Sequence, residues 1–161
     1  MKNVGIVLAV IVLILLAGCG GPSPDANRAQ PAEPALATHK DYGDYVLHFN
    51  AITTDQLQPE VARAYDIVRS KSQAMLNVTI IKKSAGASDM PVAGQVDVDA
   101  SNLTGQAKNI SLREITEGDA IYYIGEVSVA NRETLIFDIS ATPEGETSAY
   151  SVRFTQQFYT D

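Results

Sequence analysis

The stretch VAGQVDVDA (residues 92–100) decides the fold class, because its apolar and polar residues alternate almost one by one. Successive side chains of a β-strand point to opposite faces, so this alternation predicts a strand with one buried and one solvated face. Val96 and Val98 are expected to face a core, and Asp97 and Asp99 are expected to face water.

Six further segments show short apolar alternations, and turn-forming residues separate them. The predicted strands cover residues 45–51, 75–83, 92–100, 110–115, 120–129, 135–139 and 150–158. Tight turns join most of them, which favours an antiparallel β-sandwich of about seven strands, since a parallel sheet would need helical crossovers. The sequence does not decide whether the sandwich is immunoglobulin-like, because the chain has no Trp and no cysteine pair.

One segment has a different period and predicts a short helix. Apolar residues recur there at spacings of four, four and three residues, at Leu57, Val61, Tyr65 and Val68. Pro59 is suited to the first turn of such a helix, where its missing N–H costs no hydrogen bond.

The first residues have the order of a bacterial export signal. The apolar run from Val4 to Ala17 would extend only about 21 Å as a helix, which is short of the roughly 30 Å hydrocarbon layer. It leads into Leu16-Ala-Gly-Cys19, which resembles the lipobox of bacterial lipoproteins, and Cys19 is the single cysteine. The resemblance implies cleavage after residue 18, acylation of Cys19 and, with Gly20 next, sorting to the outer membrane. An uncleaved anchor, or an ordinary signal with an incidental cysteine, is the alternative.

These patterns divide the chain into three predicted parts. Residues 1–18 are predicted to be a signal peptide, residues 19–39 a flexible tether rich in Pro and Ala, and residues 40–161 one β-sandwich domain. The net charge of −7 disfavours electrostatic binding to nucleic acid. Because the lone thiol is assigned to lipid, no disulfide is expected.

Four stretches carry a resemblance to a known family. They are Gly43 to Phe49, Leu57 to Tyr65, Ile67 to Ser70 and Glu117 to Tyr123. Together they resemble the bacterial secreted family called domain of unknown function 4426, over about residues 40–159. The resemblance implies an exported protein of about this size and supplies no catalytic residue.

Charged residues provide the first candidate binding positions. Glu114, Glu117 and Asp119 form an acidic cluster beside a predicted turn, which could bind a cation or a basic partner. Turn chemistry alone also explains Asp119. Arg69 could hold a carboxylate or phosphate, and the alternative is internal pairing with Asp or Glu.

Two adjacent tyrosines provide a second set of candidate binding positions. Tyr122 and Tyr123 lie on the predicted strand 120–129, and aromatic side chains and exposed sheet edges are recurrent recognition surfaces.

No catalytic residue, metal site or cofactor is predicted. His39 and His48 do not have a metal-site spacing, and the carboxylates of Asp97 and Asp99 are too few for Ca²⁺. The sequence has no Gly-x-Ser-x-Gly motif and no free thiol, so a hydrolase would need one pocket that joins His48 with a Ser and an Asp.

The sequence therefore predicts a non-enzymatic binding or assembly module, held by lipid on the periplasmic side of a bacterial outer membrane, with an envelope protein as its partner. The alternative is a small-ligand or metal carrier, which predicts a closed apolar cavity or converging acidic and His side chains.

Overall fold

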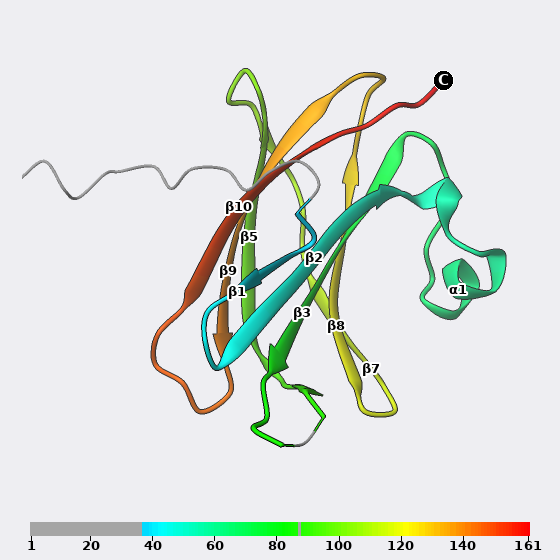
Figure 1. Cartoon of the computed structure of the whole chain (residues 1–161). Coiled ribbons are helices and arrows are strands. Elements are labelled where there is room, and N and C mark those ends of the chain that lie inside the picture. The colour runs from blue at the N-terminus through cyan, green and yellow to red at the C-terminus, as the bar shows by residue number, and fades with distance from the viewer. Residues whose placement is uncertain (1–36, 87) are drawn as a thin grey trace, which may run out of the picture.

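The computed structural model describes residues 37–86 and 88–161, so Cys19, the predicted signal peptide and most of the predicted tether lie outside the described residues. Two antiparallel sheets pack face to face in this part of the chain (Figure 1). The first sheet has the order β1 (His39–Asp41), β2 (Tyr45–Thr53), β3 (Gln73–Lys82), β8 (Ala120–Ser128) and β7 (Arg113–Glu117), and β4 (Met90–Pro91) also pairs with β3. The second has the order β10 (Tyr150–Gln157), β9 (Thr134–Pro143), β5 (Gly94–Asn102) and β6 (Ala107–Lys108).

The predicted antiparallel sandwich is confirmed, and each of the seven predicted strands overlaps a long strand of the structure. Three short strands, β1, β4 and β6, join them among the described residues. The predicted strand 110–115 is wrong in its first half, because strand β7 begins only at Arg113. Ile110 and Leu112 lie on the segment that crosses from one sheet to the other, and they pack against the core between the sheets. Ile115 instead lies on the outer face.

The strand order answers the question of topology. The seven long strands are arranged β2-β3-β8-β7 and β10-β9-β5, which is the A-B-E-D and G-F-C order of a constant-type immunoglobulin domain. Antibody domains join strands B and F by a disulfide. Here the inner faces of these two strands carry apolar side chains of the shared core that are each less than 2% exposed, namely Leu76 and Val78 on β3 and Phe137 and Ile139 on β9. Packing replaces the covalent link.

The predicted helix is confirmed as α1 (Pro59–Ala64), with Gln58 at its N-cap and Pro59 in its first turn. The 3-10 turn η2 (Thr54–Gln56) precedes it. Residues 54–72, between β2 and β3, form a segment that we call the flap. It packs on the outer face of the first sheet, where Leu57, Ala62 and Ile67 bury Ile124 (Figure 1). No helix in the described ranges is long and apolar enough to cross a bilayer.

Candidate functional site

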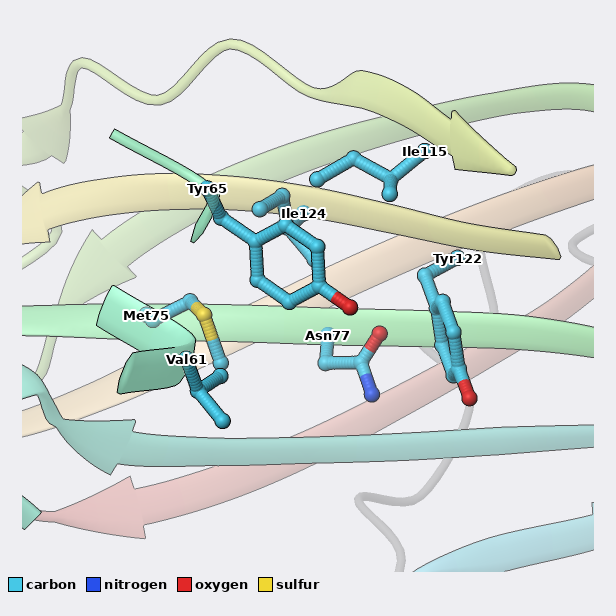
Figure 2. A pocket seen from close by; sticks show the side chains of 7 residues that line it. All are labelled: Val61, Tyr65, Met75, Asn77, Ile115, Tyr122 and Ile124. Carbon is cyan, nitrogen blue, oxygen red and sulfur yellow. The ribbon is translucent and has the colours of Figure 1, made fainter. Parts of the chain in front are cut away.

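A hollow lies between the flap and the outer face of the first sheet. Its cavity volume is about 230 Å³, and its wall is mostly apolar. Figure 2 shows the lining side chains, which are Val61, Tyr65, Met75, Asn77, Ile115, Tyr122 and Ile124.

Strand alternation explains why the sheet contributes these residues. Residues two apart on a strand share a face, so Met75 and Asn77 point outward from β3 while Leu76 and Val78 point into the core. The pairing registers place Asn77 opposite Ile124, and Ile115 opposite Tyr122. Three neighbouring strands therefore present one continuous outer surface, and the flap covers part of it.

Tyr65 fastens the flap to strand β7. Its hydroxyl donates a hydrogen bond of 2.6 Å to Oε2 of Glu117, and Arg113 donates from its guanidinium to the backbone carbonyl of Tyr65. The bond to the Glu117 carboxylate, with partial burial, raises the pKa of the Tyr65 hydroxyl above its usual value. Tyr65 is thus held at both its backbone and its side-chain end, with its ring in the wall of the hollow.

Asn77 is the polar exception in the wall. Its Oδ1 atom is closed off from solvent and has no hydrogen-bond partner among the residues that the structure describes. Figure 2 shows its amide between the rings of Tyr65 and Tyr122. An unsatisfied buried acceptor costs about 1–3 kcal/mol, so its presence in an otherwise apolar wall calls for an explanation.

The structure brings two predicted site residues, Glu117 and Tyr122, to this hollow, one through Tyr65 and one directly. Glu114 and Tyr123 lie together elsewhere. The Tyr123 hydroxyl lies 3.0 Å from Oε2 of Glu114 and accepts a 2.8 Å bond from the backbone N–H of Gly94. Tyr123 is only 5% exposed, and burial raises the pKa of its hydroxyl. Within the pair of tyrosines, only Tyr122 reaches the outer face.

Comparison with known proteins shows which family the chain belongs to. The model of the family described as Domain of unknown function (DUF4426) matches residues 39–161. The chain belongs to the DUF4426 family. A crystal structure of a DUF4426 family protein from Pseudomonas aeruginosa PAO1 is similar to it, with 33% sequence identity and a TM-score of 0.65. The match covers 76% of this chain and 94% of that one. No curated protein matches.

These matches confirm the resemblance that the sequence segments carry. Because the family is defined without a function, they assign no role to any residue of this DUF4426 domain.

The remaining predicted positions lie away from the hollow. Arg69 of the DUF4426 domain donates at 2.5 Å to the backbone carbonyl of Asp55, so its partner is internal, as the alternative proposed, but it is not a carboxylate. Asp119 is exposed in the turn between β7 and β8. Asp97 and Asp99 are exposed on the outer face of the second sheet, where the alternation placed them.

His39 and His48 show no relation to each other in the sequence, but they are neighbours in the structure. They are opposite each other on β1 and β2, with ring centroids 5.7 Å apart. Burial, and then the neighbouring His39, lower the pKa of His48. Strand β1 was missed because three residues are too few for a visible period. Within the described ranges, no group of three or more His, Cys, Asp or Glu side chains is placed to hold a metal ion.

Three lining residues also escaped sequence reasoning. Tyr65 was identified only as part of a helical stripe, and Met75 and Asn77 only as members of the predicted strand 75–83. A signal for Asn77 does exist, since it stands between Met75 and Ile81 on the same strand face.

Proposed function

We propose that this DUF4426 chain is a non-enzymatic binding module of the bacterial envelope, and that its ligand binds in the hollow under the flap. The observation that carries the proposal is an apolar cavity of about 230 Å³ whose wall contains an acceptor with no partner, Oδ1 of Asn77. Apolar pockets with a few placed polar groups are typical of small-molecule sites. The carrier alternative predicts a closed apolar cavity, and this hollow shares the apolar wall but is partly open beside Val61.

The placement in the envelope rests on the sequence. We propose that Cys19 is acylated and that the tether holds the sandwich on the periplasmic side of the outer membrane. Replacing Cys19 by serine is then expected to move the protein from the membrane to the soluble fraction. A mature protein that keeps Met1, or that carries Cys19 without lipid, would contradict this placement.

The arrangement of the histidines supports a non-enzymatic role. His48, which the hydrolase hypothesis requires, is stacked on His39 along the short edge pair β1–β2 and does not line the hollow. A purified chain that turned over substrates in a broad hydrolase screen would contradict the proposal.

A second candidate is docking of an envelope protein at strand β7, and the free edge of this strand favours it. In the described part of the chain, strand β7 pairs with β8 on one side only, and four of its five residues are exposed. Addition of a strand to an exposed sheet edge is a recurrent mode of protein recognition.

The test is photo-crosslinking in living cells. A compact diazirine-bearing aliphatic residue, close to leucine in size so that the hollow stays open, would replace Val61, which is 39% exposed and lies at the hollow. In a control chain the same residue would replace Asp97 on the opposite sheet. We expect an adduct from position 61 and none from position 97, and its mass distinguishes a small molecule from a protein. Equal crosslinking at both positions, or none at either, would refute a binding site under the flap.

A further inference from the structure

We infer that the ligand of the hollow is a small, uncharged, two-ring-sized molecule with one N–H or O–H donor, and that Asn77 accepts the hydrogen bond from that donor. This inference rests on the proposed function, because it names the ligand class of the same site.

The volume of the hollow sets the size of the ligand. An engineered apolar cavity of about 150 Å³ binds benzene, which has six heavy atoms. The hollow is about 230 Å³, roughly one and a half times as large. A ligand of about nine heavy atoms, such as two fused rings, fits this space, whereas a folded peptide segment does not.

The wall sets the polarity of the ligand. Val61, Met75, Ile115 and Ile124 offer aliphatic or thioether surface, and the rings of two tyrosines complete it. A flat ring can stack on such tyrosine rings and contact the methionine sulfur favourably. A charged ligand would lose its hydration in this wall without gaining an opposite charge, because none of the seven lining side chains is charged.

Asn77 sets the position of the donor. Its Oδ1 is buried without a partner, and the terminal amide turns readily about its last side-chain bond, so the oxygen can meet a donor inside the hollow. Once the amide has turned toward the hollow, a ligand N–H or O–H would satisfy this acceptor. A site built around such a bond rejects an analogue of the same shape that lacks the donor.

The experiment compares indole with benzofuran, which has the same two-ring frame but an oxygen in place of the N–H. The full chain, purified in detergent and labelled at its methionine methyl groups, is titrated with each compound and followed by NMR. Met75 lies in the wall and reports binding, while Met90, which is 59% exposed, reports non-specific effects. We expect the Met75 signal to shift and indole to bind about tenfold more tightly than benzofuran.

Two variants test the assigned roles. Asn77→Leu keeps a similar side-chain volume and removes the acceptor. In this variant we expect the affinities for indole and for benzofuran to lie within about twofold of each other. Partitioning of the compounds into detergent micelles is the same for the parent chain and the variant, so it does not affect this comparison. Val61→Trp fills the hollow from an exposed position of α1, where it does not disturb the sandwich core, and it is expected to abolish binding of both compounds.

The outcomes distinguish an error in the ligand class from an error in the proposed binding site. Equal affinities in the parent chain, an indole preference that survives Asn77→Leu, or unchanged binding in Val61→Trp would each overturn the inference. If neither compound shifts Met75 while position 61 still crosslinks in cells, the ligand class is wrong and the proposed site stands. If both experiments are negative, both fail.

Discussion

Glu133 offers the sharpest test of how the sandwich is held together. Its carboxylate lies 2.7 Å from Nζ of Lys108 on strand β6, and it accepts a 2.9 Å hydrogen bond from the backbone N–H of Ala130. The two side chains of the ion pair are only 20% and 14% exposed. The pair therefore joins β6 to the turn between β8 and β9 in a largely dehydrated setting, where solvent screens it poorly.

The magnitude follows from these contacts. Glu133→Gln keeps the size of the side chain and removes its charge, so two charge-assisted hydrogen bonds are weakened. Hydrogen bonds to charged groups contribute about 1.5–3 kcal/mol, and we expect the free energy of unfolding at pH 7 to fall by this amount. Urea titration of the purified chain measures it.

The contribution of Glu133 to the free energy of unfolding depends on pH, and the shift of its pKa sets the direction of that dependence. Burial alone would raise the pKa of Glu133, but the bonds from Lys108 and from the Ala130 N–H outweigh it and lower the pKa below its ordinary value of 4.5. The unfolded chain then binds the proton more readily. The contribution of Glu133 is present above about pH 4.5 and is lost as the pH falls through the lowered value in the folded protein.

Glu60 supplies the matched control. It pairs with Arg63 at 3.3 Å on α1, but these side chains are 74% and 76% exposed, so Glu60→Gln is expected to change stability by less than about 0.5 kcal/mol. A Glu133→Gln deficit no larger than that of the control at pH 7, or one that persists undiminished at about pH 2.5, would refute the reasoning.

Three further predictions concern the core and the paired histidines. Gly125→Ala would put a Cβ atom 2.9 Å from the backbone oxygen of Ser111 and from the side chains of Ile110 and Leu112, so a thermal melt should show a loss of about 1–3 kcal/mol. An unchanged melting temperature would mean that the crossing segment gives way freely. Phe137→Ala removes a fully buried ring that stacks 5.0 Å from Phe154, and denaturant titration should show a loss of about 3–5 kcal/mol, with a much smaller loss speaking against a packed centre. Because burial and then His39 lower the pKa of His48, its NMR titration midpoint should lie below 6.5, and stability should fall as the pH drops through 6.5, since the unfolded chain binds that proton more readily. A midpoint at or above 6.5 would contradict this assignment.

The strands could be predicted because the sandwich makes one face of each strand buried and the other wet. Val96 and Asp97 differ in burial for this local reason, and the pattern is visible without any tertiary information. The prediction failed where the chain leaves one sheet for the other. Ile110 and Leu112 have strand spacing, yet they pack from a crossing segment against Gly125, a contact between residues far apart in the sequence.

The candidate site was harder to predict, because it depends on which outer face becomes covered. Tyr122 and Tyr123 are neighbours, and only the parity of their strand separates the outward ring from the inward one. The apolar Val127 and Val129 share a face with Tyr123 and could have indicated that it points inward. From the sequence alone, a polar residue such as Asn77 on the outer face of a strand is expected to be solvated. Only the position of the flap places its amide in an apolar wall.

The position of the flap within the topology also separates stability from binding. Strands A and B of the sandwich pair directly as β2 and β3, so the flap between them is not needed to close the core. Its own attachment combines the small cluster around Leu57, Ala62 and Ile67 with a few hydrogen bonds. These include the two bonds of Tyr65, the bond from the Val129 N–H to the Ser72 carbonyl and the bond from Lys71 to the Asp161 carbonyl. Few buried apolar contacts mean that such a segment can open at a lower free energy than the sheets beneath it. Substitutions in the flap should therefore alter access to the hollow before they alter the unfolding of the sandwich, which is the order expected if the hollow, rather than the core, is the part of the molecule that binds.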